Sequence, residues 1–296
     1  MKRLSIIIVT YKSENDIYDC LLSIWKFCDI PQEELEVIIV DNSPKCEPMF
    51  HHLREKYGNN IILIHNTHNG GYGQGNNVGI RMATAPTIMI MNPDVRLCEP
   101  IFKTVLTAFE QDAKLCMYGM KQMLAKGIYS PLSFDCSRHV FGGFIPVITT
   151  ICNKINWYIP SIMYLQGSCF FICKRKFEQV GLFDERIFMY GEEDDIHFRL
   201  KKQYGPFFRF NKRLHYLHLT LKRPMSLSIE KKMVESIILS NQKKGINAKQ
   251  TIRNYIYYYQ VRLVSSYIKK YLMGEKNQEH ISILKDIINS LKKQMK

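Results

Sequence analysis

The sequence predicts an α/β fold, with a mostly parallel central sheet flanked by helices and a basic helical C-terminal region. Short runs rich in Ile and Val alternate with amphipathic segments in the N-terminal third, and polar side chains follow each run. These two observations predict the sheet. The third observation is that the excess of Lys and Arg lies after residue 221, where apolar residues recur at helical spacing.

The expected strands are four short apolar runs, at residues 4–9, 36–40, 61–64 and 87–91. Amphipathic segments at residues 16–27, 47–57 and 74–83 lie between them and are expected to be helices. Strands that alternate with helices indicate βαβ units, in which helices cover both faces of a parallel sheet. We therefore expect a mostly parallel sheet with right-handed crossovers.

Composition narrows the class of protein. The chain has 296 residues, 46% of them hydrophobic, which suits one large α/β domain or two small ones and excludes a disordered chain. Its nine Cys include no C-x-x-C pair, which argues against a zinc ribbon, and their odd number favours reduced thiols in the cytoplasm. The first apolar run has six residues and no cleavage site after it, so we expect a buried strand rather than a signal peptide. No uninterrupted apolar stretch reaches the length of about 18 residues that a spanning helix needs.

The C-terminal region concentrates the positive charge. Residues 222–296 carry 16 Lys/Arg and 5 Asp/Glu, whereas residues 1–221 carry 25 and 22. Gly245 and Gly274 are expected to separate helices there. Two stripes of apolar residues have helical spacing: Ile252, Ile256, Tyr259 and Leu263, and then Ile281, Leu284, Ile288 and Leu291.

This pattern has two equally weighted interpretations. An apolar stripe docks on the body of the protein and the lysines are solvated, or a basic amphipathic surface lies on anionic lipid. Nucleic acid ranks lower, because the region contains no recognisable nucleic-acid-binding module.

Polar residues follow all four expected strands, where ligands of such sheets bind. They are Thr10-Tyr11-Lys12, Asp41-Asn42-Ser43, His65 to Gly71, and Asn92-Pro93-Asp94. Each group alone is typical of a turn, but together they predict a polar ligand pocket.

The residues of this pocket suggest a ligand. The glycine-rich segment at residues 70–75 contains neither G-x-G-x-x-G nor G-K-[ST], which excludes a dinucleotide fingerprint and a P-loop. Asp41 could accept hydrogen bonds from a nucleobase or a ribose hydroxyl. Asp94 offers hard oxygen ligands, which suit Mg²⁺ or Mn²⁺ on a diphosphate.

An acidic cluster follows later in the chain. Six carboxylates lie between Asp184 and Asp195, and residues 192–195 are expected to open a helix, where the helix dipole favours negative charge. Crowded carboxylates raise one another's pKa, which suits one of them to act as a general base.

With these motifs the sequence resembles the family 2 inverting glycosyltransferases, in particular bacterial rhamnosyltransferase-like members, over roughly residues 4–220. The matching motifs occur in the family's order. They are Ser5 to Tyr11, Val40 to Ser43, Asn69 to Tyr72, Asn76 to Gly79, Met91 to Val95, Gly167-Ser168, and Gly181 to Glu185 continuing through Arg199.

The resemblance implies a GT-A fold, a nucleoside-diphosphate sugar (UDP-, dTDP- or GDP-linked) as donor and a divalent metal. It implies residues 1–95 as the donor-binding half and residues 96–221 as the acceptor and catalytic half. The charge asymmetry separates residues 222–296 as a basic helical region. The implied donor-binding residues are Thr10, Tyr11, Asp41, Asn69, Gly71, Asn77 and Asn92. The implied metal ligands are Asp94 and His218, with His215 as the alternative to His218.

The base motif departs from the family, which has Glu-Asp-x-Asp where this chain has Glu192-Glu193-Asp194-Asp195. The resemblance thus places Glu193 at the position of the catalytic base, with Asp194 as the alternative and Glu192 beside them. Glu is about as basic as Asp, but its extra methylene shifts the carboxylate, and misplacement lowers rates.

The implied activity is a hexosyl or deoxyhexosyl transfer with inversion, to a glycan or lipid-linked hydroxyl in bacterial surface polysaccharide assembly. We expect the acceptor to contact residues 124–164, which include the aromatic segments 141–144 and 156–158. The acceptor candidates are Trp157, Gly167 and Asp195. With the basic tail, this predicts a cytoplasmic protein that can associate peripherally with the inner membrane face.

Three rival functions remain. A sugar nucleotidyltransferase is disfavoured, because no glycine-rich loop follows the first strand. A non-catalytic nucleotide-sugar-binding protein is the principal alternative, with Glu193 marking a lost base and the tail recruiting partners. A nucleic-acid-binding protein is not expected.

Overall fold

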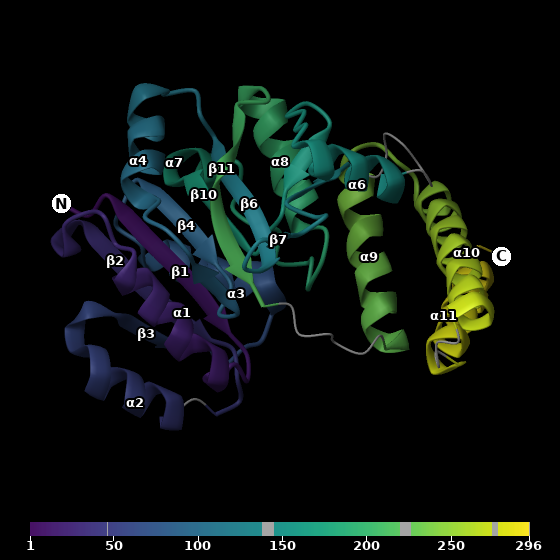
Figure 1. Cartoon of the computed structure of the whole chain (residues 1–296), viewed down its shortest axis with the longest axis horizontal. Helices are drawn as coiled ribbons and strands as arrows, with labels where there is room; N and C mark the ends of the chain where they lie inside the picture. Colours follow the sequence, from purple (N-terminus) through teal and green to yellow (C-terminus); the bar gives the residue numbers. More distant parts are fainter. Residues whose placement is uncertain (46, 138–144, 220–225, 274–277, 296) are drawn as a thin grey trace.

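The structure is a computed structural model that describes residues 1–45, 47–137, 145–219, 226–273 and 278–295. A mixed nine-stranded sheet occupies one end of the molecule, and three C-terminal helices stand at the other (Figure 1). The strand order is β3-β2-β1-β4-β10-β6-β11-β5, with β7 beside β6.

The N-terminal half confirms the predicted alternation of strands and helices. Strands β1 (Leu4–Thr10), β2 (Leu35–Asp41), β3 (Ile62–His65) and β4 (Thr87–Met91) are parallel neighbours. Helices α1 (Glu14–Lys26), α2 (Glu47–Tyr57) and α3 (Gly71–Met82) connect them, with short 3-10 turns at Gln32–Glu34 and Gly58–Asn60. Helix α3 begins at Gly71, three residues before the start of the helix expected at residues 74–83. Most of the glycine-rich segment at residues 70–75 therefore lies within the first turns of α3.

The sheet continues with strands from the second half of the chain. These are β5 (Val95–Leu97), β6 (Met117–Ala125), β7 (Ile128–Tyr129), β10 (Cys169–Cys173) and β11 (Phe208–His218). Strand β10 is antiparallel to both β4 and β6, whereas β11 is parallel to β6. Consequently β1, β2, β3, β4, β6 and β11 point the same way, and the sheet is mostly parallel, as predicted.

Helices cover both faces of the sheet, because the strand side chains alternate between two cores. Ile6 and Ile8 pack with α1, α2 and α4 (Phe102–Gln111). Ile7 packs with α3, α7 (Lys174–Gln179) and α8 (Glu192–Tyr204). A smaller unit contains the two-stranded sheet of β8 (Phe134–Cys136) and β9 (Met163–Leu165) with α6 (Ile145–Ile155).

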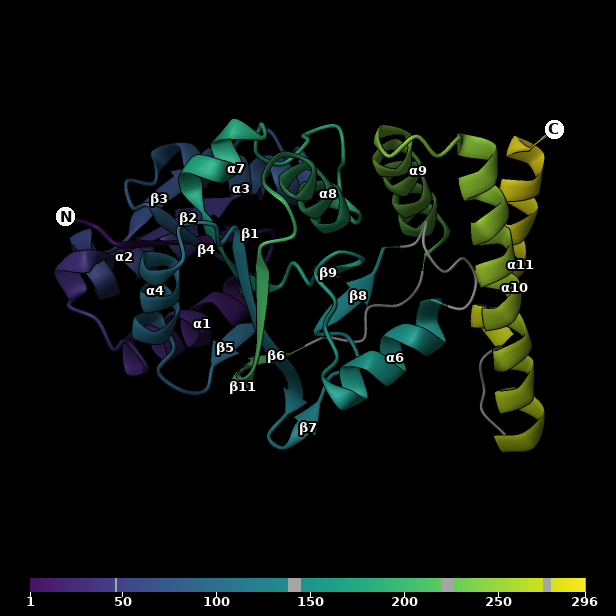
Figure 2. The same cartoon turned by 90° about the horizontal axis from the view of Figure 1, so that it is seen from above.

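The described residues beyond 226 form three helices, α9 (Leu227–Lys243), α10 (Ala248–Met273) and α11 (Gln278–Gln294). Gly245 separates α9 from α10 at a φ of +79°, and Gly274 lies outside the described residues. Both predicted apolar stripes enter a core that the three helices share, including Ile252, Tyr259, Leu284 and Leu291. Of the two interpretations of these stripes, docking on the body is therefore not what the structure has: the stripes pack on one another, and α9 is the helix that packs against α8 (Figure 2).

None of the helices in the described ranges is both long and apolar enough to cross a bilayer. The eight cysteines that the structure describes are all free thiols.

Candidate active site

Asp41 ends β2 beside the last residue of β1, because the parallel register pairs it with Thr10. Its Oδ1 accepts hydrogen bonds from the hydroxyls of Thr10 (2.7 Å) and Ser43 (2.9 Å). The residue is only 1% exposed, and its buried Oδ2 has no hydrogen-bond partner. Because an unpaired buried acceptor costs free energy, this oxygen is an obvious site for a ligand N–H or O–H.

The loop before α3 is fastened to the segment that carries the acidic cluster. Gly71 has a φ of +91°, and a Cβ there would lie 1.9 Å from the Phe188 carbonyl oxygen, so the position requires glycine. The Tyr72 N–H donates to that carbonyl at 3.0 Å. The Asn69 side chain accepts a hydrogen bond from the Gly71 N–H at 3.2 Å, which shapes the turn.

Asn77 faces the protein interior. Its side chain donates to the Phe183 carbonyl at 2.9 Å and accepts from the Phe183 N–H at 3.1 Å. The Asn77 side chain therefore holds the 183–185 segment against α3. Its contact with a sugar donor stays a prediction.

Asp94 and His218 meet because β5 pairs with β11 in an antiparallel register. The His218 Nε2 lies 3.3 Å from the Asp94 Oδ1, and the Leu219 N–H donates to the Asp94 carbonyl at 3.0 Å. The buried His218 Nδ1 has no hydrogen-bond partner. The alternative, His215, instead contacts Glu99 through its Nδ1 at 2.9 Å. The structure therefore brings His218, and not His215, to Asp94.

The Asp94 and His218 pair can supply a carboxylate oxygen, which Mg²⁺ and Mn²⁺ prefer, and an imidazole nitrogen, which is a common ligand of transition metals. The residues described here contain no cluster of three or more His, Cys, Asp or Glu side chains able to hold a metal. A divalent ion at this pair would thus need further ligands, such as diphosphate oxygens and water.

Glu193 projects from the first turn of α8, which begins after Gly191 at a φ of +100°. A Cβ on Gly167 would lie 2.2 Å from the Glu193 Oε1, so the carboxylate rests directly on this glycine. The next residue, Ser168, accepts a hydrogen bond from the Asn92 N–H at 2.9 Å. Glu193 therefore lies at the same sheet edge as the Asn92-Pro93-Asp94 motif.

Burial raises the pKa of Glu193, and the negative charge of Asp194 raises it further. A raised pKa suits a general base, although backbone N–H groups that face the carboxylate oppose the shift. The neighbouring Glu192 is buried, and desolvation followed by the charge of Glu193 raises its pKa well above the usual range.

His197 fixes the backbone of this turn. Its Nδ1 donates to the Glu193 carbonyl at 2.8 Å, and its Nε2 accepts from the Leu165 N–H at 3.1 Å. Burial lowers the pKa of His197 to about 4, so the ring stays neutral in this tautomer.

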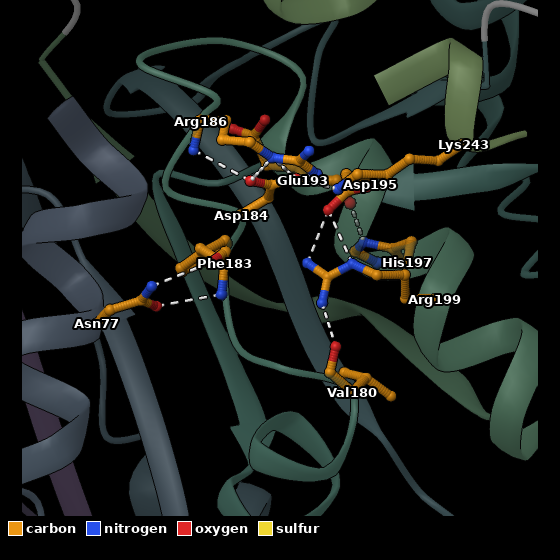
Figure 3. A network of polar contacts seen from close by, with 10 residues as sticks. All are labelled: Asn77, Val180, Phe183, Asp184, Arg186, Glu193, Asp195, His197, Arg199 and Lys243. Carbon is orange, nitrogen blue, oxygen red and sulfur yellow. Dashed lines mark hydrogen bonds and ion pairs between the residues drawn. The ribbon is translucent and has the colours of Figure 1, made fainter. Parts of the chain in front are cut away.

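Two other carboxylates of the cluster, Asp184 and Asp195, form ion pairs with Lys243 (Figure 3). Asp195 is fully buried and contacts Arg199 and Lys243 at 2.7 Å each. Lys243 also reaches Asp184 at 2.5 Å, and hydrogen bonds from Arg186, ahead of those from Lys243, lower the pKa of Asp184.

Asp194 accepts a hydrogen bond from the Ser137 hydroxyl and forms an ion pair with Lys244 at 2.5 Å. Both carboxylate oxygens of Asp194 therefore have side-chain partners. The sequence analysis missed Lys243 and Lys244 because they lie about fifty residues away along the chain, at the end of α9. Two adjacent lysines at the end of an expected helix were the only local pattern that could have indicated partners for the acidic cluster.

The proposed acceptor residues are in different environments. Trp157 is 58% exposed, Gly167 supports Glu193, and Asp195 is buried within ion pairs. Tyr158 belongs to a small aromatic core with Phe134 rather than to the surface. The segment 141–144 lies outside the described residues. Among the expected donor residues, Tyr11 is exposed beside Asp41.

The comparisons with known proteins agree with one another, because all of them find glycosyltransferases. Residues 5–126 match the model of glycosyl transferase family 2. The chain is similar to the low-salt glycan biosynthesis hexosyltransferase Agl10 of Haloferax volcanii, with 29% identity over 205 residues, or 68% of this chain and 62% of Agl10. It is also similar to the poly(ribitol-phosphate) beta-N-acetylglucosaminyltransferase TarS of Staphylococcus aureus, with 27% identity over 169 residues, or 55% of this chain and 28% of TarS. The match thus spans less than two thirds of either relative.

Solved structures share the fold. The mannosyltransferase PcManGT from Pyrobaculum calidifontis, in complex with GDP-Man and Mn²⁺, aligns with a TM-score of 0.62 at 12% identity, covering 99% of this chain and 86% of that one. Residues 1–349 of S. aureus TarS, in complex with UDP, align with a TM-score of 0.57 at 17% identity, covering 94% and 77%. Residues 5–126 of this chain thus match glycosyl transferase family 2, and the chain shares the GT-A fold of solved glycosyltransferases.

Proposed function

We propose that the protein transfers a sugar from a nucleoside-diphosphate sugar to a hydroxyl of a glycan or lipid-linked acceptor, with inversion at the anomeric carbon. The observation that carries the proposal is the placement of three groups at one sheet edge: Asp41, the Asp94 and His218 pair, and Glu193. Each offers chemistry that such a transfer needs.

The Asp41 side chain would bind the nucleoside. Its Oδ1 is held by Thr10 and Ser43, and its unpaired Oδ2 can accept a hydrogen bond from a base N–H or a ribose hydroxyl. This use of a buried acceptor is supported by the free energy that an unsatisfied carboxylate oxygen otherwise costs.

Asp94 and His218 would hold Mg²⁺ or Mn²⁺ beside the diphosphate. A bound divalent ion offsets the negative charge that develops on the departing nucleoside diphosphate. The unpaired Nδ1 of His218 and its proximity to Asp94 support this role.

Glu193 would act as the general base. As the acceptor oxygen attacks the anomeric carbon, its proton passes to the Glu193 carboxylate, and the bond between that carbon and the diphosphate oxygen breaks. One displacement without a covalent intermediate inverts the configuration. Gly167 leaves room for the Glu193 carboxylate, because a Cβ at residue 167 would occupy its space.

The proposal is tested with a panel of UDP-, GDP- and dTDP-linked sugars and Mn²⁺. We expect one nucleotide class to raise the melting temperature and to release its nucleoside diphosphate when an acceptor is present. The relatives' names, a hexosyltransferase of glycan biosynthesis and an N-acetylglucosaminyltransferase, direct the first choice of sugars and acceptors. Binding without release for every donor and acceptor would favour the non-catalytic alternative.

A further inference from the structure

Helix α10 is apolar on two opposite sides, and the structure covers one of them. Ile252, Tyr255 and Tyr259 pack into the core with α9 and α11. The outer face of α10 is defined by six residues that are 47% to 79% exposed: Tyr257, Val261, Val264, Ile268, Tyr271 and Leu272. From Tyr257 to Tyr271 these residues recur in steps of three and four, which is the spacing of one helix face, and Leu272 adjoins the last of them.

The two faces are diametrically opposed. At about 100° per residue, Val264 lies about 140° and Ile268 about 180° around the helix from Tyr259. The outer face therefore contributes nothing to the helical bundle. A contiguous exposed patch of large apolar side chains marks an interaction surface, so this face is expected to be covered by something outside the described fold.

The charges of α10 indicate what covers it. The helix contains five Lys or Arg and no Asp or Glu. Arg253 lies one turn before Tyr257 on the outer face, and Lys269 follows Ile268 at its margin; both are exposed. Lys270 also lies over the ring of Tyr271. Exposed apolar side chains bordered by cations fit an anionic lipid surface, where the apolar groups enter the interface and the cations contact headgroups.

A second copy of the chain is a poorer occupant, because pairing two such faces would bring cationic helices together without a compensating carboxylate on either. The position of α10 is also suitable, since α10 and α11 stand at the end of the molecule away from β1, β2 and β3 in both views (Figures 1 and 2). The helix can therefore meet a surface without a rearrangement of the sheet.

We propose that the outer face of α10 binds the surface of an anionic lipid bilayer and lies in its interface. The face is a different one from the two stripes that the sequence analysis singled out, since both of those contribute to the helical core. Lipid binding requires no turnover, so the proposal stands or falls independently of sugar transfer.

The test is flotation of the full-length chain with vesicles of phosphatidylcholine, with and without phosphatidylglycerol, at low and high salt. We expect binding to the anionic vesicles that weakens with salt, and at least about tenfold less binding for the double variant Val264→Asp, Ile268→Asp. The matched control is Leu22→Asp, Met82→Asp, which adds the same charge at exposed apolar residues outside the C-terminal helices and should bind like the wild type.

Circular dichroism and melting temperatures establish that both variants are folded, as expected for substitutions at exposed positions. The proposal is overturned if the anionic vesicles do not bind the wild type, or if the double variant binds them as well as the control does. It is also overturned if sedimentation shows a dimer that the double variant dissociates and that does not bind vesicles.

Discussion

The ion pair between Lys244 and Asp194 joins the C-terminal helices to the first turn of α8, and Lys244→Met should break it. The Lys244 side chain is 1% exposed, so the substitution leaves the Asp194 carboxylate in a dry environment without its cation. Removing one partner of a buried pair typically costs about 3–5 kcal/mol. The Ser137 hydroxyl still donates to Asp194, so we expect a loss of about 3 kcal/mol, at the lower end of this range. That loss is a large part of the total free energy of unfolding of a typical domain.

The assay is urea unfolding of the four proteins of a double-mutant cycle with Asp194→Asn. In the Asp194→Asn background the same Lys244→Met change should cost less than about 1 kcal/mol, because no carboxylate is stranded. Lys292→Met, at an exposed position of α11, is the control and should change stability by about 0.5 kcal/mol or less. An equal cost of Lys244→Met in both backgrounds would refute the reasoning, since the two side chains would then be energetically independent.

Three further predictions concern the site. Gly167→Ala should lower kcat for sugar transfer by about a hundredfold or more with a smaller effect on donor affinity, because the new methyl group displaces the Glu193 carboxylate; steady-state kinetics measure this. Asp41→Ala should weaken nucleotide binding by about 1.5–3 kcal/mol, measured by calorimetry, since it removes a charged hydrogen-bond acceptor; unchanged affinity would place the nucleoside elsewhere. His197 has a pKa lowered to about 4, so the unfolded chain takes up its proton first as the pH falls and the folded state loses stability between about pH 6.5 and 4. Urea unfolding should show that loss, about 3 kcal/mol, in the wild type and much less of it in His197→Gln.

The sequence predicts the N-terminal half well because its information is local. Strands β1 to β4 are apolar runs separated by amphipathic helices, and a parallel sheet brings their polar carboxyl ends together. The placement of Asp41 and Asp94 at those ends follows from the same rule.

The rest depends on contacts between distant residues. Strand β5 has three residues, and its position is set by antiparallel pairing with β11 about 120 residues later, which no local pattern contains. The same pairing distinguishes His218 from His215. Likewise, Asp194 and Asp195 pair with Lys244 and Lys243 at the C-terminal end of α9. The sequence could therefore indicate a crowded acidic cluster but not which of its carboxylates pair with these lysines.

The helical C-terminal region shows the limit of periodicity. One stripe on α10 and one on α11 were visible and are indeed buried, but the second apolar face of α10 has the same spacing and is exposed. Sequence spacing gives the faces of a helix, and only the packing shows which of them is covered.

The most direct test of the account compares Glu193→Gln with the wild type in sugar transfer and in donor binding, using the donor that stabilises the protein. We predict that transfer falls by at least about a hundredfold while the nucleotide sugar still raises the melting temperature by the same amount, because Gln keeps the shape and cannot accept the proton. Transfer at the wild-type rate by Glu193→Gln would contradict the central claim that this carboxylate is the base.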